Sequence, residues 1–209
     1  MKSLVNFFVE IGKLRNCPRR GGVLIGAKNP ATITDHLFRV ALMAWILAKE
    51  KNANLNIKKI LEMSLVHDLC ELYAGDASPY DHGRLLKENK GRWSELFDRW
   101  PRLTPGQKKN KSALKHRREK AAFKKLLKGL SIKARNEIFA NWQEYENGLS
   151  REARFVKQIN RLETLLQALE YGRQEGIRVY DSWWIGSKER IDDPLLLKFM
   201  DSLAEDFKK

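Results

Sequence analysis

The sequence is poor in cysteine and has no long apolar run. Its two cysteines, Cys17 and Cys70, have no paired spacing, which argues against both a disulfide framework and a cysteine-based zinc site. We therefore expect a protein of the reducing cytoplasm. No apolar run approaches the roughly 18 residues that a membrane-spanning helix needs, so we expect no membrane partner.

Convincing β alternation, internal repeats and linkers between separate cores are also missing. The chain has 209 residues, of which 43% are hydrophobic and six are tryptophan. This length and composition are typical of one folded globule with a sizeable core. We predict an all-α protein with a single domain over residues 1–209.

Apolar residues recur at helical spacing along most of the chain. The clearest stripe contains Phe155, Ile159, Leu162, Leu165, Leu166 and Leu169, which predicts a long amphipathic helix. Further helices are expected at about 34–48, 57–73, 112–130, 132–147 and 194–207. Thr34 is a plausible N-cap for the first of these, and Gly75 would end the second.

Positive charge is concentrated in one part of the chain. The formal net charge is +14, and residues 83–128 contain sixteen Lys/Arg against four Asp/Glu. Such a segment is able to attract nucleic acid or a phosphorylated small molecule, or it is simply a solvated helix face. We interpret about 82–112 as a basic insertion that forms a lid or an oligomer contact.

The stretch LVHDLCELYAGD, residues 65–76, places titratable groups among apolar ones. On a helix, His67 and Glu71 share a face and Asp68 lies about 100° away. Burying such groups unpaired costs roughly 2–7 kcal/mol even when they are neutral. A divalent cation would compensate them, with His36 as a further ligand, although a His-Asp pair is more often simply hydrogen-bonded.

Several ordered motifs carry a resemblance to a known family. The segments NCPRRGG, ITDHLFRVALMA, HDLCELYAGDASPYD and EARFVKQINRLETLLQALEY resemble the HD-domain metal-dependent phosphohydrolases, in their 5′-deoxynucleotidase branch. The resemblance covers roughly residues 10–81 and 112–175. It implies an HD-type helical bundle that forms a homodimer and binds one divalent ion, for which Mn, Co, Zn, Fe and Mg are the candidates.

The resemblance also implies a reaction and a set of site residues. The substrate would be a (deoxy)nucleoside 5′-monophosphate, hydrolysed to nucleoside and phosphate. Glu71 would handle the attacking water, Asp76 would act near the leaving oxygen and sugar, and Arg19 would contact the phosphate. The implied metal ligands are His36, His67, Asp68 and, at the fourth position, Asn160.

Asn160 departs from the family pattern, which has Asp at this position. An amide oxygen can ligate a hard cation but carries no charge, so we expect weaker metal binding. Asn160 either still holds a weakly bound metal, or cripples turnover, or marks a protein that has lost catalysis and kept ligand binding.

The arginine-bearing loop departs from the pattern as well. Family members often have an aromatic residue there that helps to exclude a ribose 2′-hydroxyl, whereas this chain has Arg20-Gly21-Gly22-Val23. The preference for deoxyribose is therefore open. So are the places of His82, near the site or in a surface loop, and of Glu163 and Gln167, facing the site or pairing with neighbouring helices.

These observations leave three functional hypotheses. The leading one is a metal-dependent nucleoside 5′-monophosphatase. The second is an HD hydrolase of another phosphate ester, such as a nucleoside triphosphate, for which the basic segment would be suitable. The third is a non-catalytic protein that binds nucleotides or nucleic acid, which the presence of both Glu71 and Asp76 disfavours.

Overall fold

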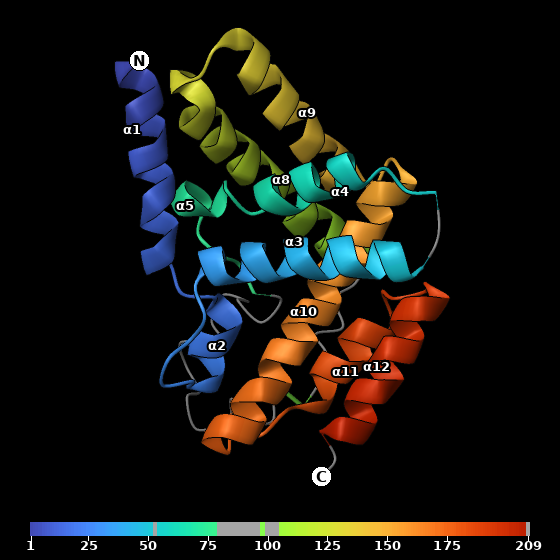
Figure 1. Ribbon diagram of the computed structural model, residues 1–209. Helices are drawn as coiled ribbons and strands as arrows, with labels where there is room; N and C mark the ends of the chain where they lie inside the picture. Colours follow the sequence, from blue (N-terminus) through green and yellow to red (C-terminus); the bar gives the residue numbers. More distant parts are fainter. Residues whose placement is uncertain (52–53, 79–96, 99–104, 208–209) are drawn as a thin grey trace.

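The computed structural model describes residues 1–51, 54–78, 97–98 and 105–207, and these ranges are helical without a strand (Figure 1). The prediction of an all-α fold is therefore confirmed. No described helix is long and apolar enough to span a bilayer. The elements are α1 (Lys2–Ile11), η1 (Gly12–Asn16), α2 (Arg20–Ile25), α3 (Ile33–Glu50), α4 (Ile57–Val66), α5 (Glu71–Ala74), α8 (Pro105–Leu126), η3 (Leu127–Gly129), α9 (Ile132–Asn147), α10 (Arg151–Glu175), α11 (Asp181–Lys188) and α12 (Pro194–Asp206).

The long helix α10 runs through the middle of the molecule (Figure 1). Ser150 caps it by accepting a hydrogen bond from the Ala153 N–H at 3.1 Å, which satisfies one of the free donors of its first turn. Its predicted apolar stripe is buried, and the helix packs against α3, α4, α9, α11 and α12. It therefore contacts helices from both the N-terminal and the C-terminal parts of the chain.

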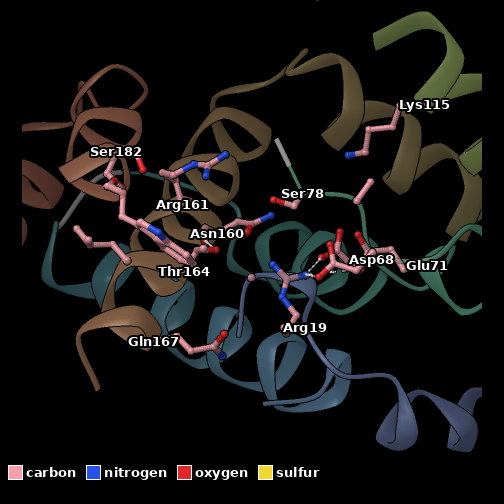
Figure 2. A pocket seen from close by; sticks show the side chains of 16 residues that line it. Arg19, Asp68, Glu71, Ser78, Lys115, Asn160, Arg161, Thr164, Gln167 and Ser182 are labelled. Carbon is pink, nitrogen blue, oxygen red and sulfur yellow. Dashed lines mark hydrogen bonds and ion pairs between the residues drawn. The ribbon is translucent and has the colours of Figure 1, made fainter. Parts of the chain in front are cut away.

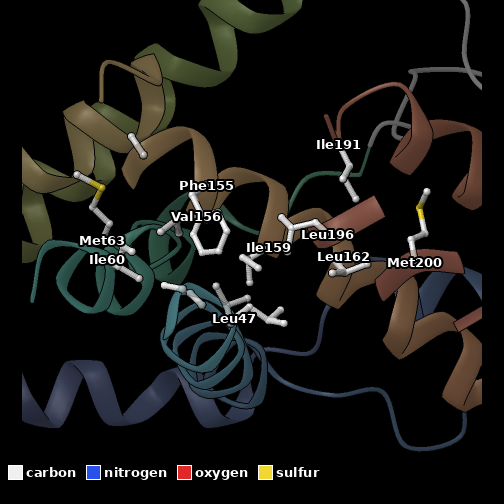
Figure 3. Packing of buried hydrophobic residues seen from close by; sticks show 14 of the residues in the cluster. Leu47, Ile60, Met63, Phe155, Val156, Ile159, Leu162, Ile191, Leu196 and Met200 are labelled. Atoms are coloured by element: carbon white, nitrogen blue, oxygen red, sulfur yellow. The ribbon is translucent and has the colours of Figure 1, made fainter. Parts of the chain in front are cut away.

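Two apolar clusters form the core, and α3 contributes to both. Val40, Ala44 and Leu47 of α3 belong to the cluster that also takes side chains from α4, α10 and α12 (Figure 3). Ile33 and Leu37 belong to the second cluster, with side chains from η1, α8 and α9. The first turns of α3 therefore lie where the two clusters adjoin, in surroundings that exclude water.

Backbone hydrogen bonds hold the loop before α3 against the start of that helix. The Arg19 N–H donates to the Ala31 carbonyl at 2.7 Å, and the Ile33 N–H donates to the Cys17 carbonyl at 2.8 Å. The helix is capped by Thr32, two residues before the predicted cap, because Thr32 and Asp35 form a capping box. The loop therefore brings Arg19 beside α3.

The predicted helix over 57–73 is wrong in its continuity, since α4 ends at Val66 and α5 begins at Glu71. Between them the N–H groups of Leu69 and Glu71 bond three residues back, as in a 3₁₀ turn. One cause is local: the His67 ring bonds the Ser64 carbonyl at 2.8 Å, the acceptor that a continuing α-helix would offer to Asp68.

The helix predicted at 112–130 begins earlier and ends sooner, as α8 from Pro105 to Leu126. Most of the predicted basic insertion at 82–112 lies outside the described residues, as does His82. The single-domain boundaries and the role of the insertion remain predictions.

Candidate functional site

His36 lies on α3 with none of its side chain exposed. Its Nδ1 contacts the buried Glu163 carboxylate of α10. Its Nε2 lies 3.3 Å from His67 Nε2 and 3.5 Å from Asp68 Oδ2. Burial lowers the pKa of His36, but the Glu163 and Asp68 carboxylates outweigh burial and raise it.

His67 follows the last residue of α4 and is also buried. Its Nδ1 lies 2.8 Å from the Ser64 carbonyl oxygen, and its Nε2 lies 3.4 Å from Asp68 Oδ2. A carbonyl only accepts hydrogen bonds, so Nδ1 must carry the proton. The Nε2 of His67 therefore presents a lone pair.

The same reasoning applies to His36, whose Nδ1 faces a carboxylate. Both rings thus direct Nε2 lone pairs at one place, which the Asp68 carboxylate also faces, and the ligand atoms of these three residues lie within 4.8 Å of one another. Three electron-pair donors without a hydrogen between them repel unless a cation or proton joins them. The donor set therefore fits a divalent ion, and a His ligand whose other nitrogen bonds a carboxylate or carbonyl is common in metal sites.

Asn160 lines the pocket that also contains Asp68. Its side-chain N–H donates to the Tyr145 hydroxyl at 2.7 Å, so the amide oxygen points away from Tyr145. An oxygen in this orientation is able to act as a neutral ligand. The buried Tyr145 ring also packs on the His67 ring, with centroids 4.9 Å apart.

The Arg19 guanidinium faces a group of carboxylates. Its Nη1 lies 3.0 Å from Asp68 Oδ2, 3.5 Å from Asp76 Oδ2 and 3.6 Å from Glu71 Oε2 (Figure 2). Burial would raise the pKa of Asp68, but in the metal-free protein the His67 and His36 rings, when a proton occupies Nε2, and the Arg19 guanidinium hold it well below its usual range. Arg19 thus neutralises part of the negative charge of the site.

Glu71 occupies the most acidic part of this arrangement. It is buried, and its Oε2 has no hydrogen-bond partner among the described residues. Burial, together with the Asp68 and Asp76 carboxylates, raises its pKa well above the usual range, and Arg19 only partly opposes them. A carboxyl group in such surroundings readily takes up a proton.

Asp76 follows Gly75, whose φ of +74° is strained for residues with a side chain. Its Oδ2 accepts a hydrogen bond from the Arg20 N–H at 2.8 Å. The Arg19 loop and the end of α5 are therefore joined directly. This contact places Asp76 at the edge of the pocket.

A pocket of about 160 Å³ opens beside these groups. It brings together Arg19, Asp68, Glu71, Asp76 and Asn160, all predicted from the sequence, whereas His36 and His67 lie buried behind it. The roles of these residues remain predictions, but the fold gathers all seven in one region. Side chains beyond the predicted set also line the pocket, among them Lys115, Thr164, Gln167 and Trp183.

Sequence reasoning left the place of Glu163 open and missed Arg39. Arg39 donates to Glu163 Oε1 through Nε at 2.9 Å and Nη2 at 2.8 Å. Burial raises the pKa of Glu163, but His36 and Arg39 outweigh it and lower the pKa. The only signal in the sequence was the position of Glu163 three residues after Asn160, on nearly the same helix face.

Comparison with known proteins places the chain in a family, since residues 11–192 match the model for the HD domain. The chain belongs to the HD-domain family. Curated relatives include human 5′-deoxynucleotidase HDDC2, which is 34% identical over 170 residues that cover 81% of this chain and 69% of that protein. The enzyme of the same name from Xenopus laevis is 33% identical, over 83% of this chain and 72% of its own length.

Solved structures share this HD-domain fold. A predicted metal-dependent phosphohydrolase from Magnetospirillum magnetotacticum superposes with a TM-score of 0.70 at 24% identity, covering 99% of this chain and 91% of that one. The PH0347 protein of Pyrococcus horikoshii gives a TM-score of 0.67 at 22% identity, with 98% of each chain covered. At these identities the likeness is one of fold, and it agrees with the family assignment.

Proposed function

We propose that this HD-domain protein is a metal-dependent phosphomonoesterase that hydrolyses nucleoside 5′-monophosphates. The observation that carries the proposal is the convergence of two imidazole Nε2 atoms and the Asp68 carboxylate within 4.8 Å, beside an arginine that faces Glu71 and Asp76. The names of the curated relatives, 5′-deoxynucleotidases, support the substrate class.

The proposed roles follow from the chemistry of each group. A divalent ion held by His36, His67, Asp68 and Asn160 would polarise the phosphate and acidify water. The Arg19 guanidinium would bind phosphate oxygens, because its planar fork matches them.

The remaining steps belong to the carboxyl groups. Glu71 would accept a proton from the attacking water, whose oxygen forms the new bond to phosphorus as the bond to the 5′ oxygen breaks. Asp76, whose carboxylate accepts a hydrogen bond from the Arg20 N–H, would contact the leaving 5′ oxygen and the sugar. That oxygen would take up a proton from water and leave as the hydroxyl of the nucleoside.

A substrate panel tests the function. Chelated protein is reloaded separately with Mn²⁺, Co²⁺, Zn²⁺, Fe²⁺ or Mg²⁺ and given deoxynucleoside and nucleoside mono-, di- and triphosphates, with phosphate and pyrophosphate measured. We expect phosphate from the monophosphates, loss of activity with chelator, and no activity in His36→Ala. Hydrolysis of triphosphates alone would favour the second hypothesis, and no release with any metal would overturn the enzyme proposal.

Glu163 provides a second test, of the metal site itself. Changing Glu163→Gln should lower divalent-metal affinity at least about tenfold, because His36 Nδ1 loses the negatively charged acceptor that makes Nε2 a more basic ligand. Titration of the chelated protein with Mn²⁺ measures the effect. Glu170→Gln is the matched control, since Glu170 also contacts Arg39 but makes no hydrogen bond or ion pair with His36 in the part of the chain that the structure describes. Equal affinities for Glu163→Gln and the unaltered chain would contradict the assignment.

We further propose that the protein forms a homodimer through α3. Phe38, Leu42, Trp45 and Ile46 expose between 39% and 67% of their surfaces and follow one another at helical spacing. Trp45→Glu should therefore convert a dimer to a monomer in sedimentation velocity, while Leu114→Glu, at an exposed apolar site on α8, should not. A monomeric unaltered chain, or a dimer that tolerates Trp45→Glu, would contradict this.

We also propose a cytoplasmic location, which the two free cysteines support. Cys17 and Cys70 are both unpaired thiols. Burial, with Glu119 and Asp68 nearby, raises the pKa of the Cys70 thiol, so it is poorly reactive. Such thiols are typical of a reducing compartment, and imaging of a tagged chain tests the location.

A further inference from the structure

The pocket extends along α10 beyond the groups proposed for chemistry. Asn160, Thr164 and Gln167 all line it, and their spacing of four and three residues puts them on one helix face. In Figure 2 the Gln167 side chain lies on the other side of Arg19 from Asp68 and Glu71. The pocket therefore extends past Arg19 on the side away from Asp68 and Glu71.

Gln167 is a largely buried polar side chain that faces the pocket. It is 7% exposed and lines the pocket, and within the described ranges no hydrogen bond to its amide is found. Its amide carries both donors and an acceptor, which are therefore available to a molecule in the pocket. A ligand with both kinds of polar atom on one edge would satisfy it.

Trp183 of α11 brings an aromatic ring to the same pocket. Its backbone is fixed, since its N–H donates to the Tyr180 carbonyl at 3.0 Å and its carbonyl accepts from the Ser187 hydroxyl at 2.8 Å. The ring tip lies so close to Gly21 that a Cβ there would be 3.0 Å from Trp183 Cη2. Gly21 thus leaves the space that the indole needs.

The indole and the proposed phosphate-binding arginine line the same pocket. Trp183 lies beside Gly21, which is two residues after Arg19. A phosphate on Arg19 would therefore have Trp183 and Gln167 available in the same pocket for the remainder of a nucleotide. The face of the Trp183 ring would be available for a base to stack on, and the Gln167 amide would be available to form hydrogen bonds with the edge of the base.

We propose that Trp183 and Gln167 form a nucleobase subsite, with the base stacked on the indole and its polar edge bonded to the Gln167 amide. The inference rests on the proposed function, of which it specifies the substrate. Stacking tolerates every base because each has a π face, and a glutamine amide is able to bond most base edges. The subsite should therefore accept all nucleotides and favour purines, whose rings are larger.

Two substrates distinguish recognition of the base from hydrolysis of the phosphate ester. They are deoxyadenosine 5′-monophosphate and 2-deoxyribose 5-phosphate, which lacks a base. For Trp183→Leu and Gln167→Leu, the ratio of kcat/KM for the nucleotide to that for the sugar phosphate should fall about tenfold. Trp184→Leu is the matched control, because both tryptophans are partly buried and pack on the core but Trp183 lines the pocket and Trp184 does not, so it should leave the ratio unchanged. An unchanged ratio in Trp183→Leu would overturn the subsite.

A binding measurement distinguishes failure of the subsite from failure of the function. Deoxyadenosine is titrated calorimetrically into the chelated protein, where no hydrolysis occurs. The unaltered chain and Trp184→Leu should bind it, and Trp183→Leu should bind it about tenfold more weakly. Equal binding by all three, or no binding by the unaltered chain, would overturn the subsite even if phosphate release is observed. Loss of binding only in Trp183→Leu would support the subsite even if no hydrolysis is found.

Discussion

Changing Glu71→Gln is expected to lower phosphate release by about 10²–10⁴-fold, the usual contribution of a general base. Glutamine keeps the shape of the side chain but takes up no proton from water. Phosphate release from a deoxynucleoside monophosphate, with the metal that is most active in the panel, measures the effect. An activity within a few-fold of the unaltered chain would show that Glu71 does not handle the water.

The same substitution should stabilise the metal-free protein, increasingly as pH rises. The pKa of Glu71 is raised in the folded state, so between its ordinary and its raised pKa the folded chain binds more protons than the unfolded one. In this interval the free energy of unfolding falls as pH rises. Glutamine does not titrate, so the variant lacks the decrease in the free energy of unfolding that Glu71 causes as pH rises.

Urea unfolding of the chelated protein at pH 5 and pH 8 measures the difference. Glu62→Gln is the control, because Glu62 lies on α4 outside the pocket lining and is half-buried. It should leave the pH dependence of stability nearly unchanged. If Glu71→Gln gave the same pH dependence of stability as the unaltered chain, the result would contradict a raised pKa of Glu71 in the folded protein.

The second large effect is expected from Asn160→Asp, which should tighten divalent-metal binding on the order of 100-fold. A carboxylate adds a full negative charge to the ligand set, and charge interactions of a few kcal/mol are usual near a protein surface. The Tyr145 hydroxyl, which accepts a hydrogen bond from Asn160, would donate to the new carboxylate instead. The hydrogen bond that orients residue 160 is therefore preserved.

Titration of chelated protein with Mn²⁺ and Co²⁺ measures this affinity, and phosphate release at limiting metal should rise with it. Asn147→Asp is the matched control, since it adds the same charge at the end of α9, outside the pocket lining. A gain that both variants share would reflect net charge alone. Identical metal affinity in Asn160→Asp and the unaltered chain would contradict the proposed fourth ligand.

Helix positions were predictable where periodic burial decides them. The stripe from Phe155 to Leu169 marks α10 because one face of each helical turn must face the core. The break after Val66 was not predictable in this way, since Leu69, Cys70 and Leu72 continue the helical spacing of apolar residues through it. It depends on the His67 ring taking the Ser64 carbonyl, a contact between a side chain and the backbone that periodicity does not encode.

The family resemblance predicted side chains that the fold gathers in one region, whereas it did not predict the partners of those side chains. Glu163 and Trp183 are ordinary helix residues in the sequence, and only the crossing of α10 with α3 and α11 gives them neighbours. The site therefore depends on tertiary contacts for the environment of each group. Motifs specify which groups are present, and packing specifies their protonation and orientation.

The backbone pairing of the Arg19 loop with the start of α3 has an evolutionary consequence. The bonds from Arg19 to Ala31 and from Ile33 to Cys17 join main-chain atoms, so they persist whatever side chains lie between them. If the proposed subsite exists, mutation of residues 20–30 is expected to alter which sugars and bases are accepted without disturbing the spacing between Arg19 and His36. Substrate range and reaction chemistry are in this way free to diverge separately among descendants of such a chain.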